Sequence, residues 1–285
     1  MAPSSVTFIR SHEAPKVTTG RSRSSRANAL RTRVAVGVAV GLAVVATGGC
    51  STGPDRTEMS PVSIARSAPT DDIDEIVLVG DSLAQEATPY LQWLTAPLPL
   101  APKFWGGSAP CDWIDVDLES GPSSVVVISF TGNSLTPCMQ DADGVQVRQD
   151  ELIERYRAGV TELVERSRLS GARVVLVGQP VRAPSFDADR EVDGINRIYQ
   201  DLAAIDPQVA FVDAGREVEA PDGSYTERLL CEEIDSDCAP DGTTVVRGDG
   251  VHFCPIDDET PCPVWSSGAH RFARAIATAI NLDHG

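Results

Sequence analysis

A serine that could act as a nucleophile stands at position 82, directly after the apolar segment 76–79. Four consecutive apolar residues predict a buried parallel strand, and the sequence from Leu83 onward is typical of a helix. In an open α/β sheet, ligands bind beyond the carboxyl ends of the strands, and the N–H groups that start a helix favour negative charge. At this position the helix N–H groups would help a serine nucleophile to stabilise an oxyanion. The alternative is a simple turn, because Gly80-Asp81-Ser82 is also an ordinary turn composition.

A histidine is the expected partner, because a serine hydroxyl is a weak nucleophile until a base accepts its proton. His252 lies in a turn-rich loop after the last predicted strand and before the terminal helix, with Asp249 three residues earlier. A tight turn can bring that carboxylate to Nδ1, where it would fix the tautomer and stabilise the imidazolium. The alternative for His252 is a loop histidine without a role. The other histidines have less favourable positions: His12, His270 and His284.

Acyl transfer also needs hydrogen-bond donors for the oxyanion. Three candidates follow predicted strand ends: the Ser82 amide, the Gly107 amide with Gly106 as its substitute, and the Asn133 side chain. Because the carboxyl ends of parallel strands share one edge of a sheet, these groups are expected to lie near one another. The alternative is a simple turn at the glycines and a turn or helix cap at Asn133.

The elements that must position these residues alternate between strand and helix. Strands are predicted at 76–79, 103–105, 124–130, 173–177 and 209–213. Apolar residues at helical spacing predict helices that begin at Leu83 and that span 150–170, 192–205 and 264–282. Such alternation indicates a parallel sheet with helices on both faces. No internal repeat or second core is evident.

The charge is unevenly distributed along the 285 residues, whose formal net charge is -17. Residues 1–50 hold seven of the 24 basic residues and one of the 41 acidic ones, which leaves 17 basic against 40 acidic in the rest. So acidic a surface would repel phosphates, which argues against a nucleic-acid partner. It is compatible with a neutral substrate such as a polysaccharide ester.

The N-terminal region has the pattern of a targeting segment. Fourteen apolar or small residues, 34–47, follow Arg31 and Arg33 and are too few for a membrane span of about 20 residues. They end at Gly48-Gly49-Cys50, which resembles a bacterial lipobox whose cysteine is lipidated. We therefore expect a signal peptide at 1–49, a flexible tether at 50–71 and one domain at 72–285. Plain secretion and an uncleaved anchor are the alternatives.

Six further cysteines form an even set, which in an exported chain indicates disulfides. Proximity favours pairing Cys231 with Cys238 and Cys254 with Cys262, and Cys111 and Cys138 are then left over. Six cysteines allow 15 pairings in all. The spacings fit no common zinc pattern, so no metal site is expected.

Taken in order, Gly-Asp-Ser-Leu, Gly107, Asn133 and Asp249-x-x-His252 resemble the SGNH (GDSL-type) hydrolase superfamily across residues 76–253. The resemblance implies a flavodoxin-like, three-layer α/β/α sandwich with a five-stranded parallel sheet and no cofactor. It also implies a role for each matching residue: Ser82 as nucleophile, Asp249 and His252 as acid and base, and Ser82, Gly107 and Asn133 as oxyanion donors.

One motif departs from the family pattern: the usual Gly-x-Asn-Asp is Thr131-Gly132-Asn133-Ser134 here. This version is similar to SGNH domains associated with membrane acyltransferases that acylate envelope polysaccharides. The resemblance therefore implies an exported esterase that removes O-acyl, foremost acetyl, groups from envelope glycans. A transferase to a sugar hydroxyl, with an integral-membrane acyltransferase as partner, and a catalytically silent glycan-binding module are the alternatives.

Overall fold

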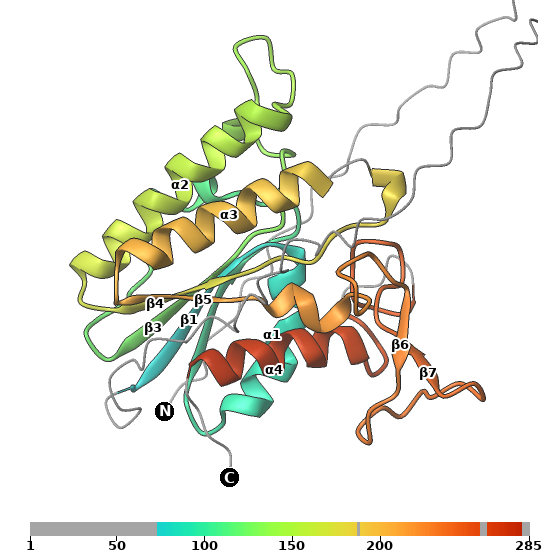
Figure 1. The fold of residues 1–285 in the computed structure, drawn as a ribbon. Coiled ribbons are helices and arrows are strands. Elements are labelled where there is room, and N and C mark those ends of the chain that lie inside the picture. Colours follow the sequence, from blue (N-terminus) through green and yellow to red (C-terminus); the bar gives the residue numbers. More distant parts are fainter. Residues whose placement is uncertain (1–72, 187–188, 257–260, 281–285) are drawn as a thin grey trace, which may run out of the picture. The chain divides into compact units, whose positions relative to one another are not determined.

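A parallel five-stranded sheet forms the centre of the computed structural model, which describes residues 73–186, 189–256 and 261–280 (Figure 1). The strand order is β2-β1-β3-β4-β5, and every neighbouring pair is parallel. This is the flavodoxin-like order. The strands are β1 (Glu75–Gly80), β2 (Leu100–Phe104), β3 (Ser124–Ser129), β4 (Arg173–Val177) and β5 (Val209–Val212).

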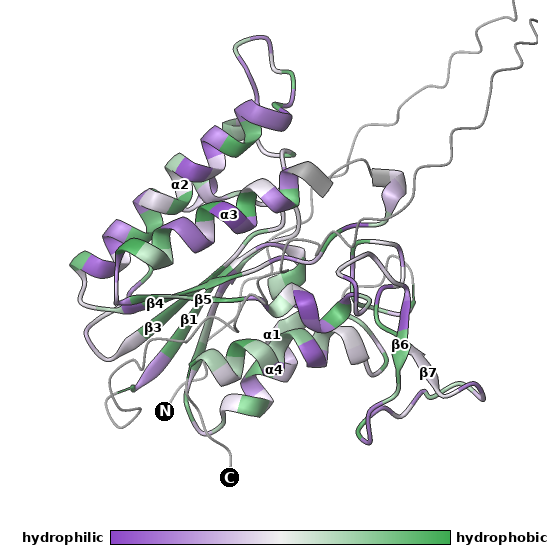
Figure 2. Ribbon diagram, viewed as in Figure 1, coloured by the Kyte–Doolittle hydropathy of each residue, from purple (hydrophilic) through white to green (hydrophobic). Residues whose placement is uncertain are grey.

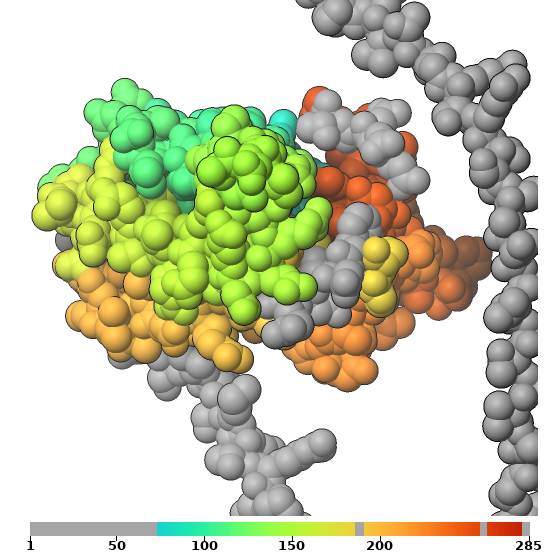
Figure 3. Space-filling view, turned by 90° about the horizontal axis from the view of Figure 1, so that it is seen from above, coloured from blue at the N-terminus to red at the C-terminus, as the bar shows by residue number. Residues whose placement is uncertain are grey.

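Two helices cover each face of the sheet, which gives the three layers expected from the sequence (Figure 1). One layer holds α1 (Ser82–Thr95) and α4 (Ser267–Ala279), and the other holds α2 (Gln149–Leu169) and α3 (Asp189–Ile205). Short 3₁₀ helices complete the connections: η2 (Pro110–Asp112), η3 (Pro137–Met139), η4 (Pro184–Phe186) and η5 (Ala214–Val218). Figure 3 views the molecule from the side that α2 covers.

Alternating residues of each strand fill two cores. In β1, Ile76 and Leu78 pack in the core on the α1 and α4 side, whereas Val77 and Val79 pack in the core under α2 and α3. All four are fully buried. Because successive side chains point to opposite faces, a central strand covered on both sides must be apolar at every position. The central strands are accordingly mostly hydrophobic in Figure 2, apart from the hydrophilic start of β1 at Glu75.

The sequence predicted the central elements and misplaced peripheral ones. β2 begins at Leu100, whereas the prediction placed this strand at 103–105. The terminal helix begins at Ser267, later than the predicted residue 264, because Ser266 caps it by accepting a hydrogen bond from the Ala269 N–H. An antiparallel hairpin of β6 (Arg228–Leu230) and β7 (Thr243–Val245) was not predicted at all. Three-residue strands carry too little periodicity to recognise.

Three disulfides are present: Cys111–Cys138, Cys231–Cys238 and Cys254–Cys262. The two pairs suggested by proximity and the pair left over are thus the ones found. The expected signal peptide, the lipidation site at Cys50 and the tether lie outside the described residues. Within the described ranges, no helix is long and apolar enough to cross a membrane.

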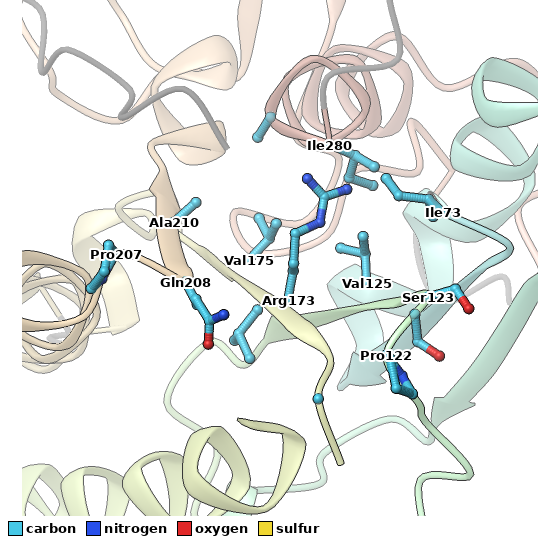
Figure 4. Close-up of a pocket in the computed structure, with 14 residues that line it drawn as sticks. Ile73, Pro122, Ser123, Val125, Arg173, Val175, Pro207, Gln208, Ala210 and Ile280 are labelled. Carbon is cyan, nitrogen blue, oxygen red and sulfur yellow. The ribbon is translucent and has the colours of Figure 1, made fainter. Parts of the chain in front are cut away.

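A cavity of about 240 Å³ opens at the amino ends of the central strands (Figure 4). Its walls include Ser124 at the start of β3, Arg173 at the start of β4 and Gln208 just before β5. In Figure 4 the Arg173 side chain extends toward Ile280. Since Ser82 follows the carboxyl end of β1, this cavity lies at the opposite edge of the sheet from the candidate nucleophile.

Candidate active site

Ser82, His252 and Asp249 form a continuous hydrogen-bonded chain. The Ser82 Oγ lies 2.9 Å from His252 Nε2, and His252 Nδ1 lies 2.7 Å from an Asp249 carboxylate oxygen. Asp249 can only accept when ionised, so Nδ1 carries the proton and Nε2 is free to accept one from the serine. Three residues that the sequence singled out on two distant segments thus meet in the geometry that activates a nucleophile.

The loop that carries His252 is shaped by the Asp249 carboxylate itself. One oxygen accepts the N–H groups of Val251 and His252 at 2.8 and 2.6 Å, and the other oxygen faces the imidazole. Burial alone would raise the pKa of Asp249, but the hydrogen bonds from His252 and Val251 outweigh it and hold this pKa below its usual value. Asp249 therefore remains an anion and an acceptor at neutral pH.

Asp81 joins the loops that follow β1 and β3. It is fully buried, and one carboxylate oxygen accepts from the Leu83 N–H at 3.2 Å as the N-cap of α1. The other oxygen accepts from the Thr131 N–H and hydroxyl, both at 2.7 Å, and from Asn133 Nδ2 at 2.8 Å. The sequence marked Gly80-Asp81-Ser82 only as a turn composition, and the contacts from Asp81 to Thr131 and Asn133 were not foreseen.

These contacts determine where Asn133 points. Its Nδ2 carries two hydrogens, and one is committed to Asp81 at 2.8 Å. The other contacts of Nδ2, to the Ser108 carbonyl and the Thr131 hydroxyl, are long at 3.5 and 3.4 Å. The second hydrogen can therefore turn toward an oxyanion. Thr131, which departs from the family pattern, supports this arrangement by donating to the same carboxylate oxygen.

The glycine turn after β2 lies against the nucleophile. A Cβ built on Gly106 would lie 3.9 Å from the Ser82 Cβ. Gly107 has a φ of +80°, and the Ser108 N–H donates to the Trp105 carbonyl at 3.3 Å, as in a type II turn with glycine in its third position. The Ser108 hydroxyl then donates to the Gly80 carbonyl at 2.9 Å and ties this turn to the end of β1.

The amide of Ser82 is also available. The first N–H groups of a helix have no partner within it. In α1 the side chain of Asp81 takes the Leu83 N–H, and its carbonyl takes that of Gln85 at 2.9 Å. Ser82 is the first residue of the helix, so its N–H can face a negative charge beside its own hydroxyl.

Glu86 is a residue of the site that sequence reasoning missed. It lies one helical turn after Ser82 and is partly buried, and Oε2 accepts from the N–H groups of Phe253 and Cys254 at 2.6 and 3.2 Å. The position of Glu86 four residues after Ser82 could be read from the sequence, because residues four apart share a helix face. Its hydrogen-bond partners, 167 and 168 residues later, could not be identified from the sequence.

The Cys111–Cys138 disulfide links η2, which follows the glycine turn, to η3, which follows Asn133. Asp112 lies beside the two sulfurs, and the three residues are close enough together to suggest a metal site. Sulfurs bonded to each other are not thiolates, however, and thiolates are what metals bind. The pair therefore acts here as a covalent link between two loops of the site.

Removing this link is expected to destabilise the domain more than removing the shorter Cys231–Cys238 bridge. The sequence separations are 27 and 7 residues. Loop entropy then gives about 3.5 kcal/mol for the first bridge and about 2.4 kcal/mol for the second. Denaturant unfolding of the two double Cys→Ser variants measures the difference, and equal losses would contradict a loop-closure origin.

A protein-family profile with the description "Protein of unknown function (DUF459)" matches residues 113–257. No curated protein matches the chain. The family match covers His252, Asp249 and Asn133 but begins after Ser82 and Gly107.

Solved structures with a similar fold include three bacterial proteins. The C-terminal catalytic domain of peptidoglycan O-acetyltransferase A (OatA) from Streptococcus pneumoniae is 17% identical, with a TM-score of 0.45 over 73% of this chain and 93% of that one. A GDSL-like lipase from Bacteroides thetaiotaomicron is 14% identical, with a TM-score of 0.45 over 76% of this chain and 92% of that one. A Geobacillus acetyl-xylooligosaccharide esterase is 16% identical, with a TM-score of 0.48 over 74% of this chain and 95% of that one. Likenesses this distant say nothing of activity, which must come from the site.

Proposed function

The chain belongs to the DUF459 family, whose description names no activity, and from the geometry of its site we propose that it is an exported serine esterase of the SGNH type. Its substrates are O-acyl esters, foremost acetyl esters, of envelope glycans. The observation that carries the proposal is the unbroken chain from Ser82 Oγ through His252 to Asp249, with bonds of 2.9 and 2.7 Å.

In the proposed reaction, Ser82 Oγ attacks the ester carbonyl while His252 Nε2 takes its proton. The tetrahedral oxyanion is bound by the amides of Ser82 and Gly107 and by Asn133 Nδ2. His252 then returns the proton to the departing sugar oxygen, which leaves an acyl-enzyme. Water, activated by the same imidazole, hydrolyses the acyl-enzyme to the carboxylic acid and restores Ser82.

Export is supported by the three disulfides, since such bonds persist in oxidising compartments. We propose that the leader 1–49 directs export and that lipidated Cys50 anchors the domain at 72–285 to the membrane through the tether at 50–71. An integral-membrane acyltransferase remains the proposed partner for the transferase alternative, in which a sugar hydroxyl replaces water. In that case product formation depends on the added sugar.

The proposal is tested with p-nitrophenyl acetate and a fluorophosphonate probe. An esterase releases acetate without an acceptor, and the probe modifies the peptide that contains Ser82. A transferase is labelled in the same way but turns over only when a sugar acceptor is present. Absence of both labelling and hydrolysis would overturn the assignment and favour the glycan-binding module.

A neutral glycan is favoured as substrate by an aromatic side chain at the rim of the site. Trp105 precedes the glycine turn, is 43% exposed and packs on Trp113 with ring centroids 4.4 Å apart. A ring held in this way can stack on the apolar face of a sugar at little cost in conformational entropy.

Trp105→Ala should therefore raise KM for O-acetylated xylo-oligosaccharides about fivefold, which corresponds to about 1 kcal/mol of lost contact. The KM for p-nitrophenyl acetate should hardly change, because this small ester does not extend to the ring. Trp93→Ala is the matched control, since Trp93 is 58% exposed on α1, away from the glycine turn. Equal effects on both esters would argue against a sugar contact at Trp105.

A further inference from the structure

We propose that Glu86 is a positioning residue for His252: its carboxylate holds the backbone that follows the catalytic base, and its negative charge favours the protonated imidazole. This inference rests on the proposed esterase function. It gives a role to a partly buried acid that the Ser-His-Asp chain does not use.

The hydrogen bonds of Glu86 place His252 relative to Ser82. Ser82 and Glu86 are four residues apart in α1 and so lie on the same face of the helix. The Phe253 N–H, directly after His252, donates to Glu86 Oε2 at 2.6 Å, and the Cys254 N–H donates to the same oxygen at 3.2 Å. One rigid helix thus carries the nucleophile and anchors the loop of its base.

Anchoring alone does not explain a carboxylate. An amide oxygen would accept the same two N–H groups and would avoid the cost of burying a charge. Within the described part of the chain, no lysine or arginine forms an ion pair with Glu86. A partly buried acid without such a partner, placed beside a catalytic group, points to a functional use of its charge.

The groups that shift the pKa of Glu86 indicate what its charge does. Burial raises the pKa of Glu86, and the strongest opposing influence is attraction to His252, followed by the hydrogen bonds from Phe253 and Cys254. The Asp249 carboxylate raises this pKa further, and Glu86 in turn contributes to the raised pKa of Tyr90. His252 therefore has two acids around it, Asp249 at Nδ1 and Glu86 beside its backbone.

Two neighbouring carboxylates stabilise the imidazolium that forms when His252 takes the serine proton. The negative charge of Glu86 contributes only where Glu86 is ionised, so its contribution weakens as the pH falls through its raised pKa. Below that pH only the two hydrogen bonds to the loop remain.

Glu86→Gln separates the charge from the anchoring, because the amide oxygen still accepts both N–H groups. We expect kcat/KM for p-nitrophenyl acetate to fall about fivefold at neutral pH, which corresponds to about 1 kcal/mol. The acidic limb of the kcat/KM profile should shift to lower pH, as expected when a negative charge beside the general base is removed. Glu86→Ala removes the anchor as well and should lose more activity.

Glu165→Gln on the exposed side of α2 is the matched control, since it removes the same charge far along the chain from the site. If Glu86→Gln has the wild-type pH profile while Glu86→Ala is impaired, Glu86 is a purely structural anchor and the proposed role of its charge is overturned. Wild-type kinetics in both variants would overturn the anchoring too.

The role of Glu86 can still be tested if the esterase proposal itself fails. Wild-type protein without Ser82-dependent hydrolysis would refute the proposed function but not the contact between Glu86 and the His252 loop. NMR titration of the His252 ring then tests the charge directly. A lower His252 pKa in Glu86→Gln than in wild type supports the inference, and an unchanged pKa overturns it.

Discussion

Ser82→Ala is expected to lower kcat for p-nitrophenyl acetate roughly 10⁴- to 10⁶-fold, the loss typical of a removed serine nucleophile. No acyl-enzyme can form without Oγ, and His252 then has no hydroxyl to deprotonate. The fold should be unaffected, because among the described residues Ser82 Oγ has a side-chain partner only in His252 Nε2, at 2.9 Å. Stopped and steady-state assays on the purified variant measure the loss, and thermal unfolding checks the fold.

The matched control for this prediction is Ser236→Ala, an exposed serine in the loop closed by Cys231–Cys238. It should keep wild-type kinetics and fluorophosphonate labelling, whereas Ser82→Ala should lose both. Residual activity of Ser82→Ala within tenfold of wild type would remove Ser82 from the role of nucleophile.

The sheet was predictable because its strands carry their own signal. Segments such as 124–129 and 173–177 are apolar at nearly every position, and only a strand covered on both faces requires this. The three-layer order then follows from alternation with amphipathic helices. The β6–β7 hairpin was missed because its strands are only three residues long and are held by distant partners. The Leu230 carbonyl accepts from Arg271 of α4 at 2.7 Å, and Glu232 and Asp235 of the connecting loop form ion pairs with the same arginine.

Residues of the site that belong to a scarce type could be predicted from the sequence, whereas a residue of a common type was missed. With four histidines in the chain, position in a loop was enough to select His252. With 41 acids, nothing local marks Glu86, whose partners are 167 and 168 residues away. Asp81 stands between these cases: its turn was visible, but its bonds to Thr131 and Asn133 required the loops after β1 and β3 to be neighbours.

This dependence on distant neighbours explains why Thr131 can replace the glycine of the family pattern. Its N–H and its hydroxyl each lie 2.7 Å from the Asp81 carboxylate oxygen that also holds Asn133. Burial raises the pKa of Asp81, and the bonds from Thr131 and Leu83 oppose that shift. A carboxylate accepts without donating, so it suits a site where three donors converge on one oxygen.

Asp249→Asn should cost about 10⁴-fold in kcat, because it reverses the imidazole tautomer. The asparagine oxygen can replace the Oδ1 that accepts from Val251 and His252 at 2.8 and 2.6 Å, so the loop keeps its shape. Its NH₂ group then faces Nδ1, which must become an acceptor. Nε2 consequently carries the proton and cannot take one from Ser82.

The control is Asp222→Asn, because Asp222 Oδ1 likewise accepts the N–H group two residues later, from Ser224 at 3.0 Å, in an exposed turn without a histidine. Both variants should remain folded at neutral pH, and only Asp249→Asn should lose turnover. The low pKa of Asp249 adds a pH dependence: its stabilising bonds are complete above the unfolded value of about 3.9 and are lost as the pH falls through its lower folded value. Wild-type stability should therefore decline at acidic pH by an amount that Asp249→Asn does not show, and kcat within tenfold of wild type in this variant would remove Asp249 from the triad.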